Sequence, residues 1–315
     1  MTTFLVTLSA VAVILLAAVP GYLLRRRGMI SESCIPGCSK ILLYVCQPCL
    51  YIYSFHIPFS LEKLGRIGIF TALCLAVHAV MLGVTFLVLN KKSRERVTYR
   101  IMTVACAFGN CAFFGIPVIE ALMPEVASDV IIYTTVYAFI MNMIAWTVGS
   151  AIIARDVHYI NAKTLFLNPT MIGFAIGMLI FVTGITLPSD LAGMITTTAR
   201  MSTPLSMLIM GMRLAGMDFR RVFTNRPVYF AVAVKQFGLP LLAFALVYFL
   251  PISLEIKETF FITCACPIAS IVLNFSEIIG EGQEDAANAV LLGTMLSIVT
   301  LPIVSLLLPL LAGSV

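Results

Sequence analysis

Charged residues are scarce in this chain of 315 residues. Only 11% of the residues are Asp, Glu, Lys or Arg, whereas 60% are hydrophobic, and the mean hydropathy is +1.04. A soluble domain carries about 25% charged residues, so this composition excludes an ordinary soluble protein. A chain this apolar is expected to reside in a lipid bilayer.

The residues that usually carry catalysis or bind metals are also few. A membrane enzyme needs His, Asp or Glu side chains that converge within the bilayer, and the chain has three histidines in all. The stretch Cys46-Gln47-Pro48-Cys49 has CxxC spacing but no His or acidic partner in its segment, and Cys in an apolar helix acts as a small hydrophobic residue. No Gly-x-x-x-x-Gly-Lys-[Ser/Thr] nucleotide loop is present. We therefore expect no enzyme, no metal site, no cofactor and no direct use of ATP.

What the sequence does contain is a series of apolar stretches. A membrane-spanning helix needs roughly 20 mostly apolar residues, and the longest connections between such stretches hold about ten residues. Ten segments meet the criterion: about 4–24, 34–55, 67–89, 99–123, 129–154, 165–186, 190–216, 227–250, 258–280 and 286–310. The predicted fold class is an all-α membrane protein with ten transmembrane helices.

Lys and Arg are distributed unevenly between the two membrane faces that these segments define. One face receives fifteen: Arg25, Arg26, Arg27, Lys40, Lys91, Lys92, Arg94, Arg96, Arg100, Arg155, Lys163, Arg213, Arg220, Arg221 and Arg226. The other receives Lys63, Arg66 and Lys257. Because cytoplasmic loops are enriched in Lys and Arg, the first face is predicted to be cytoplasmic and both termini external. The net charge of +5 then reflects topology and indicates no nucleic-acid partner.

The two halves of the chain share a pattern of Gly and Pro. A shift of 156 residues carries Gly21 onto Gly177 and Pro48 onto Pro204, and it brings His78 within one residue of Lys235; a shift of 150 carries Pro117 onto Pro267. Five helices per half is an odd number, so equivalent helices run in opposite directions. The pattern predicts a first five-helix repeat at 1–154, a short cytoplasmic connection at 155–164 and a second, inverted repeat at 165–315.

Two interruptions occur at matching places, in the fourth segment of each half. These are Gly109-Asn110-Cys111-Ala112-Phe113-Phe114-Gly115-Ile116-Pro117 and Ala265-Cys266-Pro267-Ile268-Ala269-Ser270. Paired, interrupted hydrophobic segments indicate the substrate site of a secondary transporter. Segments four and nine are therefore expected to be broken helices.

The first interruption resembles the Gly-Asn-x-x-Phe-x-Gly-x-Pro signature of the auxin efflux carrier family. Weaker similar stretches are Leu167-Asn168-Pro169, Thr203-Pro204-Leu205 and Leu296-Ser297-Ile298-Val299-Thr300-Leu301-Pro302. The resemblance implies a bile-acid-symporter-like fold in which a scaffold domain and a transport domain meet and segments four and nine cross. The short connection at 155–164 is similar to that of bacterial permeases, some of which are assigned to malonate transport. A homodimer is expected from the resemblance alone.

The broken helices suggest a site for an organic anion. A helix interrupted in the membrane exposes N–H groups at one end, where the helix dipole favours negative charge. We expect substrate contacts from Asn110, Pro117, Lys235, Pro267, Ser270, Asn274, Gln47 and Thr203, with His78 as a coupling residue. The alternatives are a helix–helix hydrogen bond for Asn110, a Lys235 side chain that extends to the cytoplasmic surface, and an interior His78 without a coupling role. For Gln47 and Thr203, the alternative is that each only satisfies the helix locally beside the proline that follows it. Arg200 makes segment seven unusually polar, as expected of a cavity-lining helix.

The leading interpretation is a secondary active transporter in the bacterial inner membrane that moves carboxylates or dicarboxylates such as malonate by alternating access. Segments one, two, six and seven are the expected scaffold because they show the clearest repeat. H⁺ or Na⁺ is the expected coupling ion. A sodium-coupled symporter of bile-acid-like anions, an exporter of auxin-like monocarboxylates and a channel remain open as alternatives.

Overall fold

The regular structure of the chain is helical. The computed structural model describes residues 2–156, 158, 168–217 and 219–313, and within them the only β structure is one isolated bridge. The first half forms α1 (Thr2–Leu16), α2 (Val19–Arg26), α3 (Cys34–Ile41), α4 (Gln47–Phe55), α5 (Leu61–Glu95), α6 (Val97–Ala105), α7 (Ile116–Leu122), α8 (Ala127–Ile144) and α9 (Ser150–Ala154). The second half forms α11 (Pro169–Thr183), α12 (Ser189–Arg200), α13 (Ser202–Ala215), α14 (Phe219–Thr224), α15 (Arg226–Ala233), α16 (Leu239–Tyr248), α17 (Leu254–Ala265), α18 (Ile271–Ile279), α19 (Gln283–Ser305) and α20 (Leu308–Ala312).

Among the described residues, six helical stretches are long and apolar enough to cross a membrane. They are Thr3–Arg26, Cys34–Phe55, Leu61–Glu95, Pro124–Ala154, Arg226–Tyr248 and Gln283–Ala312, and two shorter apolar helices are Cys111–Leu122 and Pro169–Thr183. The predicted all-helical, multi-pass membrane protein is thus confirmed. The count of ten spans and the inverted repeat stay predictions, since the remaining predicted segments are shorter or interrupted. Of the connection predicted at 155–164, only Arg155, Asp156 and His158 lie within the described residues.

Short π-helical turns precede three prolines inside the long helices. They are η1 (Leu42–Cys46), η2 (Cys111–Gly115) and η6 (Val234–Gly238), and the prolines follow at positions 48, 117 and 240. Proline lacks an N–H and its ring clashes with the carbonyl four residues earlier, and a π turn is one way in which the helix ladder adjusts. The helix geometry therefore changes locally just before each of these three prolines.

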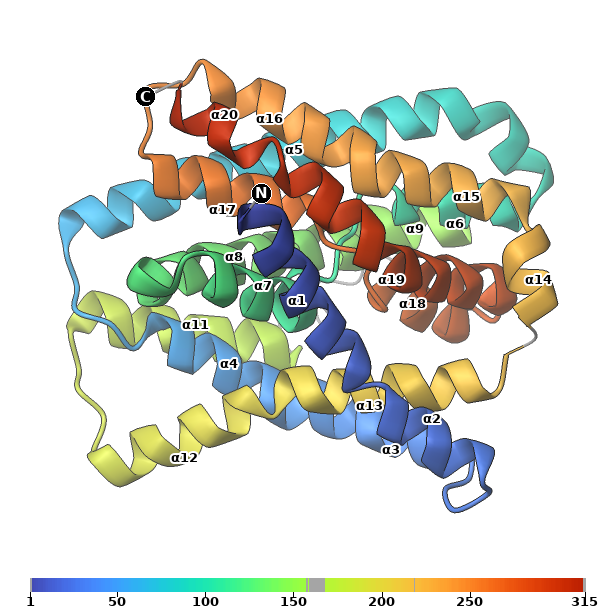
Figure 1. Ribbon diagram of the computed structural model, residues 1–315, viewed down its shortest axis with the longest axis horizontal. Coiled ribbons are helices and arrows are strands. Elements are labelled where there is room, and N and C mark those ends of the chain that lie inside the picture. The colour runs from blue at the N-terminus through green and yellow to red at the C-terminus, as the bar shows by residue number, and fades with distance from the viewer. Residues whose placement is uncertain (1, 157, 159–167, 218, 314–315) are drawn as a thin grey trace.

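One group of helices packs through glycine. A Cβ atom at Gly211 of α13 would meet the backbone of Ala18, directly before α2, and of Tyr22 within α2. A Cβ atom at Gly173 of α11 would meet the backbone of Pro48 in α4. Close approach of membrane helices commonly relies on such small residues. In Figure 1, α2, α3, α4, α11, α12 and α13 lie together in the lower part of the molecule, in agreement with the contacts among them. We refer to these helices as the glycine-packed group.

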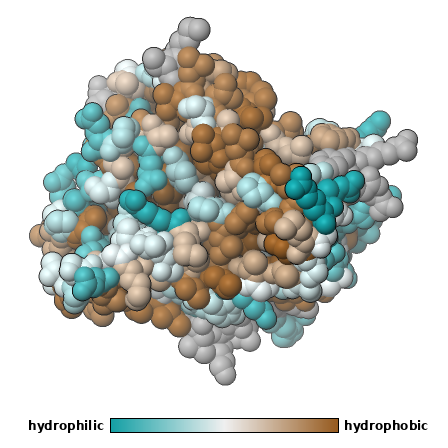
Figure 2. Space-filling view, turned by 60° about the horizontal axis from the view of Figure 1, so that its bottom comes forward, coloured by the Kyte–Doolittle hydropathy of each residue, from teal (hydrophilic) through white to brown (hydrophobic). Residues whose placement is uncertain are grey.

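The other helices surround a continuous apolar core. Phe70 of α5 stacks on Tyr133 of α8 at a centroid distance of 5.3 Å and meets the Phe260 ring of α17 edge-on at 5.6 Å. In Figure 1, α5, α15, α16 and α17 occupy the upper part, and α7 and α8 lie between them and the glycine-packed group. Figure 2 shows hydrophobic side chains over much of the middle of one face, with hydrophilic ones mostly toward its left and right.

Candidate functional site at the crossing of two broken segments

Segments four and nine are interrupted where the sequence predicts. Helix α6 ends at Ala105 and helical structure resumes at Cys111, while α17 ends at Ala265 and α18 begins at Ile271. Cys266 is extended, with φ −58° and ψ 149°, because the residue before a proline is disfavoured in the helical region. The prediction of two broken helices is correct.

The two interruptions run antiparallel to each other. Gly109 and Ile268 form an isolated antiparallel bridge. The Asn110 backbone N–H donates to the Pro267 carbonyl at 2.7 Å, and the Ala269 N–H donates to the Phe108 carbonyl at 3.0 Å. Each broken segment thereby forms hydrogen bonds with some of the backbone groups that the break in the other segment leaves unpaired. A non-helical backbone within a membrane needs such partners.

This pairing places opposite helix ends side by side. Asn110, which precedes the helical stretch Cys111–Leu122, lies against Pro267 just beyond the end of α17. Ala269, just before α18, lies against Phe108 beyond the end of α6. The N-terminal end of a helix carries partial positive charge and the C-terminal end partial negative charge. We call the paired interruptions, residues 106–110 and 266–270, the crossing. It presents donor groups and acceptor groups within one small region.

Lys235 lies at this crossing and has no exposed surface. It belongs to the π turn η6, and its Nζ donates to the carbonyls of Cys264 and Cys266, both at 2.8 Å. A Cβ atom on Gly109 would lie 2.8 Å from Nζ, so the ammonium also touches the other broken segment. Of the two alternatives for Lys235, the buried position is correct and extension to the surface is wrong.

Asn110 is buried, with 5% of its surface exposed. Its carbonyl accepts from the N–H groups of Phe114 and Gly115, both at 3.2 Å. Its side-chain Nδ2 has no hydrogen-bond partner within the part of the chain that the structure describes. A buried donor without a partner is costly. The side chain is thus available to a guest at the crossing.

His78 of α5 also reaches the crossing. Its ring lies 6.0 Å from that of Phe108 and 5.0 Å from that of Tyr137. Its Nδ1 contacts the Cys74 carbonyl at 2.7 Å and must donate there, and its buried Nε2 has no hydrogen-bond partner among the described residues. His78 and Lys235 therefore approach the two interruptions from different helices.

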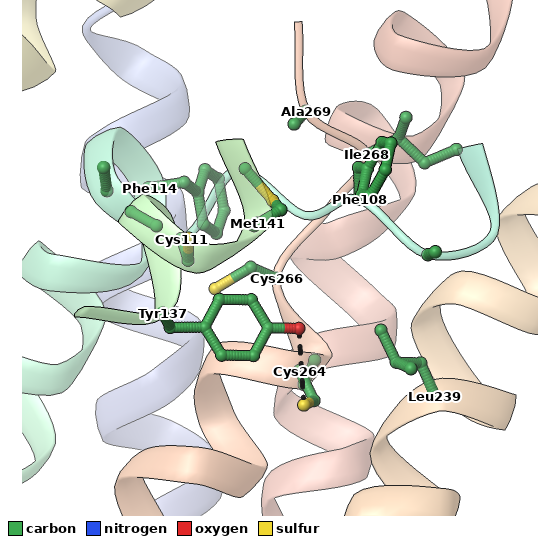
Figure 3. Close-up of a cluster of buried hydrophobic side chains, with 14 of the residues drawn as sticks. Phe108, Cys111, Phe114, Tyr137, Met141, Leu239, Cys264, Cys266, Ile268 and Ala269 are labelled. Atoms are coloured by element: carbon green, nitrogen blue, oxygen red, sulfur yellow. Dashed lines mark hydrogen bonds between the residues drawn. The ribbon is translucent and has the colours of Figure 1, made fainter. Parts of the chain in front are cut away.

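Thiol and aromatic groups fill the space around the crossing. Figure 3 shows the Cys111, Cys266 and Tyr137 side chains close together, with Phe114 nearby and Ile268 and Phe108 beyond them. The Cys264 thiol donates to the Tyr137 hydroxyl at 3.5 Å. Among the described residues no group of His, Cys, Asp or Glu has the arrangement of a metal site. These cysteines act as apolar packing residues.

A cavity of about 130 Å³ opens beside the first broken segment. It is lined by Ala112, Ile116, Pro117 and Glu120 on one side and by Leu50, Tyr53, Ala199, Arg200, Ser202 and Thr203 on the other. The first set belongs to η2 and α7, and the second to α4, α12 and α13. The cavity therefore separates the crossing helix from the glycine-packed group.

The cavity holds one basic and one acidic side chain. The Arg200 guanidinium faces the Tyr53 hydroxyl and the Glu120 carboxylate. The Ser202 hydroxyl is buried without a partner. The polar character of segment seven indicated that Arg200 lines a cavity. Tyr53 and Glu120 were not expected there, because neither lies in a segment with a similar cluster of polar residues.

The structure brings some predicted site residues together and leaves others apart. Asn110, Lys235 and Pro267 meet at the crossing, and Pro117 and Thr203 face each other across the cavity. Ser270 directly precedes α18, and Asn274 lies one turn into it; both are partly exposed. Gln47 is buried in α4 with its Oε1 unpartnered, facing the Tyr51 hydroxyl.

Comparison with known protein families identifies the family to which the chain belongs. The family described as membrane transport protein matches residues 6–305, nearly the whole sequence. Among curated proteins, none matches the chain significantly. The broken, crossing segments and the family match agree, and the chain belongs to the membrane transport protein family, that of the auxin efflux carriers.

Proposed function

We propose that this transporter is a secondary carrier for small organic anions that works by alternating access at the crossing. The observation that carries the proposal is the buried, unpartnered Nδ2 of Asn110, which stands directly before the helical stretch Cys111–Leu122. Broken transporter helices point their N-terminal ends at anionic groups of the substrate. An amide donor beside such an end suits a carboxylate.

The packing supports a division into a fixed and a moving part. We assign α2, α4, α11, α12 and α13, which belong to predicted segments one, two, six and seven, to a scaffold. Glycine contacts join α2 to α13 and α11 to α4 within it, and α12 packs on α4. The crossing segments then belong to the transport domain of two inverted five-helix repeats. The cavity between α7 and the scaffold helices lies at the boundary of the two groups, where alternating access requires an opening.

Short carboxylates are the proposed substrates. The cavity beside the first broken segment has space for a guest, and Arg200 adds a basic group to its wall. Malonate is the first candidate because of the family resemblance, and auxin-like monocarboxylates are the second. By the same resemblance and the distribution of Lys and Arg, we place the protein in the bacterial inner membrane, as a homodimer with both termini outside.

Counterflow tests the proposal. Proteoliposomes preloaded with unlabelled malonate should transiently accumulate labelled malonate without an ion gradient, because a carrier exchanges substrate across its site. Asn110→Ala should raise the half-saturating concentration about tenfold, which corresponds to about 1.4 kcal/mol for one charge-assisted hydrogen bond.

The matched control is Asn225→Ala. Asn225 donates to Asp285 at 2.6 Å, away from the crossing, so its loss should leave half-saturation unchanged. Folded wild-type protein that shows counterflow neither of malonate nor of indole-3-acetate would refute a carrier of this kind. An unchanged half-saturation in Asn110→Ala would remove Asn110 from the site.

A further inference from the structure

We propose that the Lys235 ammonium is a resident cation of the crossing and occupies the place at which a sodium-coupled carrier would hold its ion. The inference rests on the carrier function proposed above and makes it specific: anion transport by this protein needs no Na⁺. It also decides against the sodium-coupled alternative.

Lys235 binds the kind of atoms that bind coupling cations in other carriers. Its Nζ lies 2.8 Å from the carbonyl oxygen of Cys264, in the last turn of α17, and 2.8 Å from that of Cys266, directly after the helix. Carbonyls at the C-terminal end of a helix lack intrahelical partners and carry the negative end of the dipole. In broken transporter helices, these ends and the unwound carbonyls beside them are the ligands of coupling cations.

The space around the Lys235 amine is too small for a second cation. Lys235 is completely buried, and a Cβ atom on Gly109 would lie 2.8 Å from Nζ and 3.0 Å from Cε. The opposite broken segment thus closes over the amine, and glycine is the residue that leaves room for it. A second cation bound to the same two carbonyls would have to displace the side chain.

The charge of the amine has no carboxylate partner. None of the ion pairs between described residues includes Lys235. The groups to which its Nζ donates are the backbone carbonyls of Cys264 and Cys266. An ammonium that is balanced only by carbonyl dipoles leaves positive charge at the crossing. That charge repels Na⁺ and attracts the carboxylate of a substrate.

The test is thermal stability of the purified protein in detergent, in NaCl and in N-methyl-D-glucamine chloride of equal ionic strength. The Tm of the wild type should be the same in both salts. In Lys235→Ala the two carbonyls lose their donor, so its Tm should be lower in the Na⁺-free salt. Its Tm should rise by about 2 °C in NaCl at a concentration tenfold above Kd.

A second ligand probes the vacated space directly. Propylammonium replaces the atoms that Lys235→Ala removes and should raise the Tm of this variant, whereas propan-1-ol, which lacks the charge, should do so less. Lys235→Met keeps most of the apolar volume and should gain nothing from propylammonium. A purely structural role of Lys235 would lower the Tm of both variants without a response to either cation.

Two results would overturn the inference. One is a rise in wild-type Tm with Na⁺, a measurement that does not depend on the folding of any variant. The other is a folded Lys235→Ala protein that responds neither to Na⁺ nor to propylammonium. Both readouts are independent of the transported solute, so a failure of malonate counterflow would leave this test intact.

Discussion

Gly109 is the position at which the crossing is most sensitive to a single added carbon. In Gly109→Ala, the new Cβ would lie 2.8 Å from Lys235 Nζ, 3.0 Å from Cε and 3.4 Å from the Cys266 carbonyl oxygen. Two of these neighbours belong to one side chain, which can move only by lengthening its hydrogen bonds to Cys264 and Cys266. Each such charged bond contributes about 1.5–3 kcal/mol. Partial loss of both, offset by about 0.4–1 kcal/mol from the reduced entropy of the unfolded chain, should destabilise the protein by about 1–2 kcal/mol.

A double-mutant cycle separates this clash from a general effect at the crossing. In the Lys235→Ala background, Nζ and Cε are gone and the Cys266 oxygen is the remaining close neighbour. The cost of Gly109→Ala should therefore fall to near zero, which gives a coupling of about 1–2 kcal/mol. Thermal unfolding in detergent and Na⁺-free buffer measures the cycle, since 1 kcal/mol shifts Tm by about 1.5 °C in a chain of 315 residues.

The control for this cycle is Gly83→Ala in α5. A Cβ atom there meets no atom within 4 Å, and alanine is the better helix former by about 1 kcal/mol, so its Tm should stay the same or rise. Equal costs of Gly109→Ala in the wild-type and Lys235→Ala backgrounds would show that the amine does not lie against Gly109, and the description of the crossing would be wrong.

Two further substitutions test the packing on either side of the crossing. Gly211→Ala places its Cβ against the backbone of Ala18 and Tyr22, which cannot move independently; the overpacking should cost about 1–3 kcal/mol, and an unchanged Tm would contradict the glycine-packed scaffold. Thr300→Val removes the hydroxyl that donates to Gln236 Oε1 at 2.9 Å in the core. The unpaired amide oxygen should cost about 1–3 kcal/mol, and a variant as stable as the wild type in the same thermal assay would show that this bond contributes nothing.

The sequence was sufficient for features that depend on local chemistry. The apolar composition predicts a multi-pass helical protein because each stretch must satisfy its own backbone in lipid. The positions of both breaks can also be predicted from the sequence. Pro267 and the Gly109–Pro117 signature disrupt an α-helix whatever the tertiary structure around them. The family could also be reached from that signature, and the match over residues 6–305 confirms it.

The tertiary contacts of the polar side chains could not be predicted from the sequence. Sequence position marks Lys235 as an expensive residue for a membrane segment, but it does not show that Nζ binds carbonyls 29 and 31 residues further along the chain. Position likewise gives no reason to bring Arg200 near Glu120 and Tyr53, which come from three different segments.

The sequence by itself thus determined that this chain lies in a membrane, that it is helical and where two of its helices break. The tertiary structure alone decided that the breaks pair as Asn110 with Pro267, that Lys235 closes the end of α17 and that Asn110 Nδ2 is left without a partner. The reason is physical: helix formation and helix breaking depend on neighbours along the chain, whereas a buried donor or charge takes its partner from whichever segment the fold brings within hydrogen-bond distance.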